Sequence, residues 1–356
     1  MTILDCVLVT GGHGFIGTHL VPMLPKDLPI VVVDNLLKQV HPNLAKTDFS
    51  QNADTYVADI SDLKAWDRIL TKYRPTTIIH LAAETSTGLS GTQIDTHTST
   101  NVNGLGVLLT ALVQHKVVPK KFVIASSRAV YGEGNWIDLE GGLVAVEKRN
   151  IKDLSNHRWA PRNPINLEVF LNDSKGHNWQ DTPKNPTSVY GLTKSFQEDL
   201  LKLWCKTNEV SLSILRFQNV YGPGQTPSNS YTGILGLFIR SAMQGLALEV
   251  YEGGGIIRDF VFVTDVVRSI LQSLENDEML SKADVGTGSQ LSLLKVAEMI
   301  TAHYGTPDPV IVNKFRVGDV RAAYCDPAGW LPGWVPKVTF EEGLPATIAY
   351  VEKFFG

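Results

Sequence analysis

The stretch LVTGGHGFIG, residues 8–17, is the part of the sequence that decides the fold. It passes from an apolar run directly into a segment of helical character, and Gly11, Gly14 and Gly17 follow the spacing G-x-x-G-x-x-G. Glycine permits a tight turn and lets the backbone approach a pyrophosphate, while the helix that follows offers free N–H groups and the positive end of its dipole. The stretch therefore predicts a strand, a turn and a helix that bind a dinucleotide. A purely structural turn is the alternative interpretation.

The acidic residue expected in a dinucleotide site stands at the end of the next apolar run. PIVVVDN, residues 29–35, ends in Asp34 and Asn35. A carboxylate at this place hydrogen-bonds the adenosine ribose hydroxyls and repels a 2′-phosphate, so NAD is predicted rather than NADP. A further apolar run ends in Asp59 and Ile60, which we expect beside the adenine.

Short apolar runs alternate with amphipathic segments through the first 217 residues. The runs are continuously rich in Val, Ile and Leu, which is typical of strands buried on both faces of a parallel sheet. Strand and helix in alternation predict an α/β fold with a Rossmann-like, doubly wound parallel sheet. Strands are expected at residues 6–11, 29–35, 54–60, 76–83, 121–127 and 211–217, and helices at residues 15–24, 62–72, 93–115 and 188–207.

The pattern changes after about residue 219 to short mixed elements, glycine-rich turns and proline-rich pieces. We therefore predict an NAD-binding domain over residues 1–218 and a smaller mixed α/β substrate domain over residues 219–356. Segments such as residues 258–270 are expected to return to the first domain.

Residues 133–186, hereafter the insert, interrupt the alternation. They contain Trp136, Trp159 and Trp179 and have no clear period. A loop of this length inside a compact domain is usually functional or forms a local subdomain. A lid or wall over a bound sugar is one prediction, and a peripheral elaboration or an oligomer contact is the other. At least two of the tryptophans are expected to pack inside the insert.

The bulk composition excludes several classes of protein. The 356 residues are 43% hydrophobic and carry a formal net charge of -4, with no polybasic run that would indicate nucleic-acid binding. Cys6, Cys205 and Cys325 are far apart and odd in number, so neither a disulfide framework nor a metal site is predicted, and a reducing, cytoplasmic location is favoured. No signal peptide or membrane-spanning run is expected.

In SVYGLTK, residues 188–194, Tyr190 and Lys194 are four positions apart and share one face of a helix. Taken alone, such a pair is more often surface decoration than chemistry. The apolar residues predicted to form the packing side of this helix are Val189, Leu192, Phe196, Leu200 and Leu203.

Eight motifs in order make the chain resemble the extended short-chain dehydrogenase/reductases, in the branch of NAD-dependent nucleotide-sugar epimerases and dehydratases. They cover nearly the whole chain except the insert: TGGHGFIG, HLAAET, NVNGLG, SSRAVYG, SVYGLTK, RFQNVYGPG, RDFVFVTDVV and RVGDVR. Together they are specific for the branch but not for the substrate.

The resemblance implies a catalytic group of Ser127, Tyr190 and Lys194. Tyr190 would act as general acid and base on a sugar hydroxyl, and Ser127 would share its proton. A free tyrosine has a pKa of about 10, so we expect the Lys194 ammonium and the nicotinamide to lower the pKa of Tyr190. Lys194 would also hold the nicotinamide ribose.

The resemblance also implies the remaining binding residues. His80 is expected to be a packed strand histidine, and Asp319 to orient Arg316 or Arg321. The cofactor set is Gly11, Gly14, Phe15, Ile16, Gly17, Asp34, Asn35, Asp59, Ile60, Leu81, Ala82, Ala83 and Asn101, together with Tyr190 and Lys194. The substrate set is Thr85, Ser86, Thr87, Ser127, Arg128, Asn219, Arg258, Arg316 and Arg321, of which the last three arginines are expected at the diphosphate.

Three functions remain open at this point. The first is C4 epimerisation of a UDP- or dTDP-hexose through a 4-keto form, with no membrane or nucleic-acid partner and, by resemblance, as a homodimer through a helix pair that includes the Tyr190 helix. The second is reduction of a 4-keto-6-deoxy sugar nucleotide, or an unusual dehydration. Arg128 and Ala129 stand where dehydratases carry an acidic pair, so dehydration would need Glu84 or an insert residue. The third is a non-catalytic NAD-binding regulator.

Overall fold

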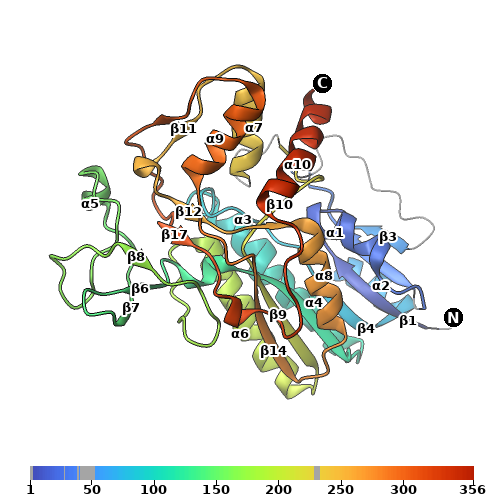
Figure 1. The fold of residues 1–356 in the computed structure, drawn as a ribbon. Helices are drawn as coiled ribbons and strands as arrows, with labels where there is room; N and C mark the ends of the chain where they lie inside the picture. Colours follow the sequence, from blue (N-terminus) through green and yellow to red (C-terminus); the bar gives the residue numbers. More distant parts are fainter. Residues whose placement is uncertain (1–2, 28, 38–39, 41–52, 228–232) are drawn as a thin grey trace.

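A computed structural model describes residues 3–27, 29–37, 40, 53–227 and 233–356. Its centre is a sheet of seven parallel strands in the order β14-β9-β5-β4-β1-β2-β3 (Figure 1). The strands are β1 Leu4–Thr10, β2 Ile30–Asp34, β3 Ala53–Val57, β4 Tyr73–His80, β5 Lys121–Ser127, β9 Ser211–Phe217 and β14 Leu280–Val285. The six strands predicted from the sequence are confirmed, and the doubly wound class with them. The seventh strand, β14, was not predicted, because LSKADV is too polar to stand out as an apolar run.

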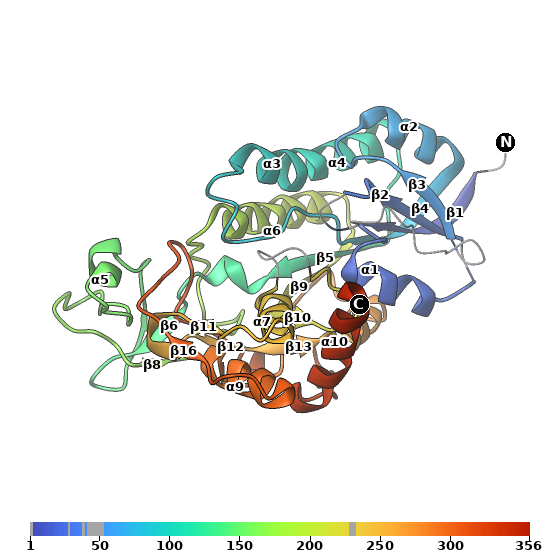
Figure 2. The same cartoon turned by 90° about the horizontal axis from the view of Figure 1, so that it is seen from above.

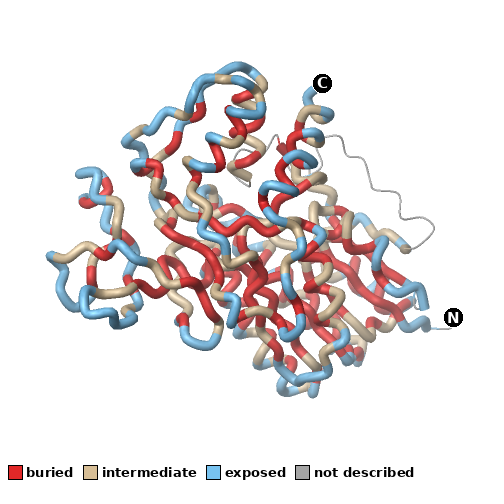
Figure 3. Tube along the Cα trace, in the orientation of Figure 1, coloured by how far each residue is buried: buried red, intermediate tan, exposed pale blue. Residues whose placement is uncertain are grey.

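Helices cover both faces of this sheet (Figure 2). On one face lie α2 Leu63–Lys72, α4 Leu105–Gln114 and α6 Val189–Thr207, and on the other lie α1 Phe15–Leu20 and α8 Val263–Leu274. Successive strand residues alternate between the two layers: Leu8 packs with the first set of helices, and Val7 and Val9 pack with the second. This is why the strands read as continuous apolar runs. The central strands are mostly buried (Figure 3), whereas the edge strand β3 has only intermediate and exposed residues.

The predicted helices are also present. The segment predicted at residues 93–115 is built from α3 Ile94–Thr98, a π-helical stretch Ser99–Gly104 and α4, and the segment at 15–24 from α1 and a 3-10 turn, Val21–Met23. The predicted packing side of α6 is wrong at three of its five residues, whereas Leu200 does pack against the core. Leu192, Phe196 and Leu203 are 60%, 46% and 69% exposed, while Lys194, Gln197 and Glu198 are among the residues facing the core. Helical periodicity marks an apolar stripe but does not tell which neighbour covers it.

The C-terminal part forms a second, smaller layer around its own apolar cluster. Its helices are α7 Ile234–Met243, α9 Leu293–Tyr304 and α10 Phe340–Phe355. Its short strands are β10 Asn219–Tyr221, β11 Glu249–Val250, β12 Ile257–Arg258, β13 Phe260–Phe262, β15 Leu291–Ser292, β16 Val310–Ile311 and β17 Ala322–Ala323, with 3-10 turns at Glu252–Gly254 and Pro327–Gly329. The chain returns to the main sheet at α8 and β14. The division at residue 218 remains a prediction.

The insert forms a local subdomain beside the C-terminal layer (Figure 1, left). It contains a small antiparallel sheet, β7-β6-β8, made of β6 Asn135–Ile137, β7 Leu143–Ala145 and β8 Asp173–Ser174, and the helix α5 Ile151–Ser155. Trp136 is buried in a cluster that includes Ala322 and Tyr324, so the insert packs on the C-terminal layer. Within the described residues, no helix is long and apolar enough to cross a membrane, and no group of His, Cys, Asp and Glu side chains is arranged to hold a metal ion.

Candidate active site

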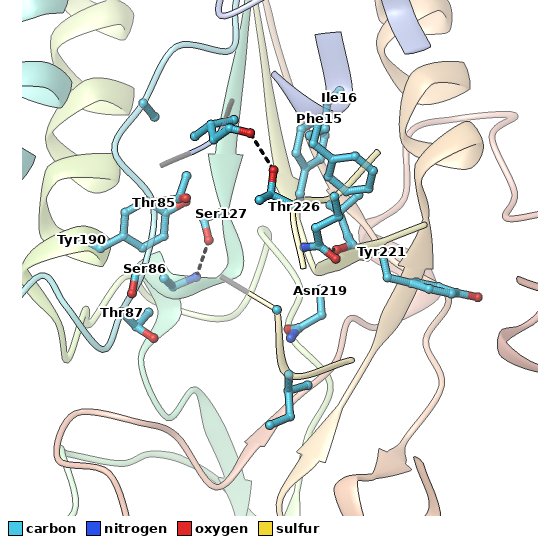
Figure 4. A pocket seen from close by; sticks show the side chains of 18 of the residues that line it. Phe15, Ile16, Thr85, Ser86, Thr87, Ser127, Tyr190, Asn219, Tyr221 and Thr226 are labelled. Atoms are coloured by element: carbon cyan, nitrogen blue, oxygen red, sulfur yellow. Dashed lines mark hydrogen bonds between the residues drawn. The ribbon is translucent and has the colours of Figure 1, made fainter. Parts of the chain in front are cut away.

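A cavity of about 690 Å³ opens where the carboxyl ends of β1, β2, β4, β5 and β9 meet the C-terminal layer. Ligands of open α/β sheets bind at this edge. Figure 4 shows Tyr190 and Ser127 on one side of the cavity, Phe15 and Ile16 toward one end, and Asn219 across from them. The predicted residues among its lining are Gly11, Gly14, Phe15, Ile16, Gly17, Asp34, Asn35, Ile60, Leu81, Ala82, Ala83, Thr85, Ser86, Thr87, Ser127, Arg128, Tyr190, Lys194, Asn219, Arg258 and Arg316.

The glycine turn leaves no room for side chains on its inner side. Gly11 has φ +70°, and a Cβ there would lie 2.7 Å from the backbone nitrogen of Ala82. A Cβ on Gly17 would lie 2.5 Å from the Cα of Gly12, so α1 packs directly on the turn. Gly14 is the residue before the first turn of α1. The backbone N–H groups at the start of α1 thus lie beside the cavity, in the arrangement that fits a pyrophosphate.

Asp34 lies at the end of β2, and its carboxylate is oriented by the turns around it. Its Oδ2 accepts a hydrogen bond from the backbone of His13 at 3.0 Å, and its Oδ1 accepts one from the backbone of Leu36 at 2.8 Å. Asp59 does not line the cavity; its Oδ2 instead accepts a hydrogen bond from Nδ2 of Asn35 at 3.2 Å. Asp59 therefore does not reach the cavity itself but orients Asn35, which lines it.

Asn101 is fully buried outside the cavity and holds one of its walls. Its Oδ1 accepts a hydrogen bond from the Glu84 backbone at 2.8 Å, and its Nδ2 donates to the Glu84 carbonyl at 2.9 Å and to Oγ1 of Thr193 at 3.0 Å. Asn101 lies in the π-helical stretch, and its own carbonyl accepts a hydrogen bond from Nε2 of Gln197 at 2.8 Å. Such stretches occur often at functional sites. The asparagine ties the loop after β4 to the Tyr190 helix.

Ser127 at the end of β5 and Tyr190 in the first turn of α6 are brought together. Burial raises the pKa of the Tyr190 phenol, while a hydrogen bond with Ser127 and the charge of Arg128 act in the opposite direction. The expected effect of Lys194 on this pKa is not found. Lys194 is buried, its Nζ donates to the Ala125 carbonyl at 2.9 Å, and burial lowers its own pKa to about 7, which weakens it as a fixed positive charge.

The hydroxyl residues after β4 line the cavity near Tyr190 (Figure 4). Ser86 is held at φ 120°, a conformation that side chains rarely adopt, and its Oγ accepts a hydrogen bond from the Leu89 backbone at 3.1 Å. Strained residues of this kind tend to cluster at functional sites. His80, at the end of β4, is fully buried against Thr10, and burial lowers its pKa to about 3, which confirms a packed strand histidine.

Positive charge gathers on the other side of the cavity. Nε of Arg128 donates to Oδ1 of Asn219 at 3.0 Å. Nη2 of Arg258 donates to Oδ1 of Asp319 at 2.6 Å, so Asp319 pairs with Arg258 rather than with the two arginines predicted. Arg316 also lines the cavity.

Arg321 is not among the lining residues. Its Nη1 instead donates to the backbone carbonyl of Glu252 at 2.8 Å, so the Arg321 side chain is bonded to the 3-10 turn Glu252–Gly254. No residue of the insert lines the cavity either, so within the described residues the predicted lid or wall is wrong. The insert instead packs on the C-terminal layer. Trp159 stacks on His157 within the insert.

Sequence reasoning missed the lining contributed by the C-terminal layer. These residues are Gln225, Ile234, Leu235, Leu237, Phe238, Leu248, Val250, Tyr251 and Leu293. Four of them lie in α7, Val250 lies in β11, Leu293 begins α9, and the others lie in connecting segments. The apolar ones look like ordinary core in the sequence. The glycines after Tyr251 were the available signal, because a glycine-rich turn after a strand often borders a ligand.

Comparison with known proteins agrees with this geometry. A sequence model of the NAD dependent epimerase/dehydratase family matches residues 7–145 and 172–286. The chain is 42% identical over 343 residues to a dTDP-L-rhamnose 4-epimerase from Burkholderia thailandensis, covering 95% of this chain and 92% of that protein.

Two solved structures extend the comparison to the fold. UDP-glucose 4-epimerase from Thermotoga maritima, with UDP-glucose, has a TM-score of 0.77 at 28% identity and covers 99% of this chain and 100% of its own. UDP-glucose 4-epimerase from Thermus thermophilus, in complex with NAD, has a TM-score of 0.74 at 27% identity and covers 98% of this chain and 99% of its own. With the family match spanning most of the sequence, the chain belongs to the NAD dependent epimerase/dehydratase family.

Proposed function

We propose that the protein is an NAD-dependent nucleotide-sugar 4-epimerase whose substrate is a dTDP-6-deoxyhexose of the dTDP-L-rhamnose type. One observation carries the proposal: a single cavity joins the glycine turn, the Ser127–Tyr190 pair and the arginines 258 and 316. This one cavity therefore connects residues suited to a dinucleotide with residues suited to a sugar nucleotide. The relative at 42% identity acts on dTDP-L-rhamnose, which suggests the base and the sugar.

The residues present fit NAD. The close packing at Gly11 and Gly17 leaves backbone N–H groups for the pyrophosphate, and the Asp34 carboxylate lies at the strand end where the adenosine ribose binds in this class of fold. Asn35, Ile60, Leu81, Ala82 and Ala83 complete this end of the cavity. When bound, NAD would supply a reversible hydride acceptor for the sugar C4, and the sugar would pass through a 4-keto form.

Tyr190 is the proposed acid and base. Its phenolate would accept the proton of the sugar 4-hydroxyl, and its phenol would return it when the alcohol forms again. Ser127 would share this proton and hold the oxygen in place. Lys194 would hold the nicotinamide ribose with the N–H groups of Nζ that its bond to the Ala125 carbonyl leaves free.

The substrate would lie with its sugar at Thr85, Ser86 and Thr87 and its diphosphate at Arg258 and Arg316. A guanidinium presents forked donors that match phosphate oxygens, which favours arginine for this role. Arg128 and Asn219 are joined by a hydrogen bond and would contact the part of the substrate between these ends. These assignments are proposals for each residue.

The test is an NMR assay of purified protein with dTDP-L-rhamnose, and in parallel with UDP-glucose, without added cofactor. Appearance of the C4 epimer, seen as a changed coupling of the H-4 proton, is the expected result. Turnover that requires added NAD⁺ or NADP⁺ in stoichiometric amounts and stops at the 4-keto sugar would replace the proposal by a 4-ketoreductase running in reverse, and loss of water from the sugar would replace it by a dehydratase. Bound NAD without turnover of either substrate would favour the non-catalytic regulator.

We further propose that the protein is a cytoplasmic homodimer. The exposed apolar residues Leu192, Phe196 and Leu203 lie on α6, which supports a helix pair formed by two copies. Three buried free cysteines support a reducing compartment.

A further inference from the structure

Arg149, in the insert, is buried beneath the loop that carries Arg316 of the cavity lining. Its side chain is 2% exposed, and those of Glu133 and Glu252 are 1% and 0% exposed. Nε of Arg149 donates to Oε1 of Glu133 at 2.7 Å, and its Nη1 donates to Oε2 of Glu252 at 2.6 Å. Nη1 also donates to the Trp159 carbonyl at 2.9 Å. This guanidinium is therefore fixed in one orientation by partners on the insert and on the C-terminal layer.

The same group reaches residues 316–321, hereafter the arginine loop. Nη2 of Arg149 donates to the backbone carbonyl of Asp319 at 2.8 Å. Glu133 supplies a second attachment, because its Oε2 accepts the backbone N–H of Arg321 at 2.9 Å. The insert therefore binds the main chain of the arginine loop at two places two residues apart.

Asp319 carries this attachment into the cavity. Its Oδ1 accepts Nη2 of Arg258 at 2.6 Å, and the side chain of Arg316 lies three residues before it in the same loop. Gly318, between Arg316 and Asp319, has φ +87°, and Val317 is 54% exposed, so residues 317–318 add little packing of their own. Besides the two bonds from the insert, the loop is held by the buried Val320 and by Oγ1 of Thr187, which donates to the Gly318 carbonyl at 3.3 Å.

We propose that Arg149 is a positioning residue for the substrate diphosphate: by holding the arginine loop from outside the cavity, the insert pre-organises Arg258 and Arg316. The inference rests on the proposed function and assigns the insert a part in it. Two guanidinium groups facing one anion repel each other before the anion binds, and a mobile loop would relieve this by moving them apart. When the loop is held in place, the unfavourable free energy of keeping the two guanidinium groups close together is already included in the folded state. The diphosphate therefore binds more tightly.

The experiment measures binding of dTDP and UDP by calorimetry, and the kinetics of epimerisation, for the variants R149M and R149K. For R149M we expect the Kd of the nucleoside diphosphate and the KM of the nucleotide sugar to rise about tenfold, as for loss of a hydrogen bond to a charged group. R149K should restore part of the affinity. The kcat value should stay within about twofold, and the Kd of NAD should not change, because Arg149 does not reach the glycine turn.

Arg162 provides the matched control, since it makes an ion pair with Asp153 at 2.5 Å within the same insert and does not reach the arginine loop. The variant R162Q should keep wild-type binding. A merely structural role of Arg149 would lower the melting temperature of R149M and leave the Kd of its folded fraction unchanged.

R149M leaves two carboxylates buried, and where this prevents folding, E133Q carries the test. Arg149 and the Arg321 backbone donate to the two different carboxylate oxygens of Glu133. Glutamine would place an NH₂ group at one of these two positions, so one of the two hydrogen bonds is lost. E133Q should therefore raise the Kd of the nucleoside diphosphate as well. Wild-type affinity in folded R149M or in E133Q overturns the inference. A wild-type protein that binds neither dTDP nor UDP overturns the proposed function instead.

Discussion

Replacing Gly17 by alanine tests the packing that places the N-terminus of α1 at the dinucleotide. In an isolated helix, alanine is more favourable than glycine by about 1 kcal/mol. In the folded chain, the new Cβ would lie 2.5 Å from both the Cα and the carbonyl oxygen of Gly12, which are backbone atoms. Since ordinary contacts begin at about 3.5 Å, the helix and the turn have to separate by roughly 1 Å.

Gly106 in α4 is the matched control, because a Cβ there would meet nothing within 4 Å among the described residues. G106A should therefore raise the free energy of unfolding by about 0.5–1 kcal/mol. G17A gains the same helix propensity but also carries the overpacking cost, about 1–3 kcal/mol. The difference between the two variants isolates that cost.

The assay is thermal or denaturant unfolding of both variants without cofactor, followed by titration with NAD. Because a displacement of about 1 Å moves the N–H groups of α1 away from the pyrophosphate, G17A should bind NAD about tenfold or more weakly, and G106A should bind it normally. Equal stability of G17A and G106A, together with an unchanged Kd for NAD, would refute the reasoning.

Three further changes have defined outcomes. Y190F should lower kcat by about 10²–10⁴-fold and leave the Kd of NAD unchanged, as measured by epimerisation kinetics and titration, because the phenol is the proposed acid and base. Burial lowers the pKa of His177 to about 3, so the native state stays unprotonated where the unfolded chain takes up a proton. The effect of this histidine on the free energy of unfolding is therefore constant above pH 6.5. Between pH 6.5 and about pH 3 that free energy falls by about 1.4 kcal/mol per pH unit. H177N should flatten the decline of the melting temperature between pH 6.5 and 4. Replacing exposed Leu192 and Phe196 by serine should yield a monomer in analytical ultracentrifugation.

Each of these has an outcome that counts against it. Substantial turnover by Y190F would remove the tyrosine from the chemistry. H303N, at an exposed histidine, is the control for His177, and an equal effect of both on the acid slope would show that burial is not the cause. A serine variant at residues 192 and 196 that sediments as the wild type would place the dimer contact elsewhere.

Much of the fold was predictable because strong local signals agree with the tertiary structure. The central parallel strands were visible as continuous apolar runs, since both of their faces are covered by helices. Strand β14 was not visible, because Ser281, Lys282 and Asp284 interrupt its apolar character. Asp284 is nevertheless buried in the sheet, where its carboxylate accepts a hydrogen bond from Tyr131 at 2.6 Å. A hydrogen-bond partner distant in the sequence offsets the cost of burying such a carboxylate, and no local sequence pattern indicates which residue that partner is.

From the sequence alone, the alternation of strands and helices indicated the class of the fold, and the spacing within one short segment indicated the glycine turn. The proposed catalytic group of Ser127, Tyr190 and Lys194 was implied by the resemblance of eight motifs to a known family. The tertiary structure alone decided how charges pair across the chain. Asp319 joins Arg258 rather than Arg316 or Arg321, Arg321 turns away from the cavity, and Arg149 reaches the arginine loop from the insert. The attraction between opposite charges depends on their distance in space and not on their separation in the sequence. Which carboxylate pairs with which guanidinium is therefore decided only when packing brings distant segments to within a few ångströms of each other.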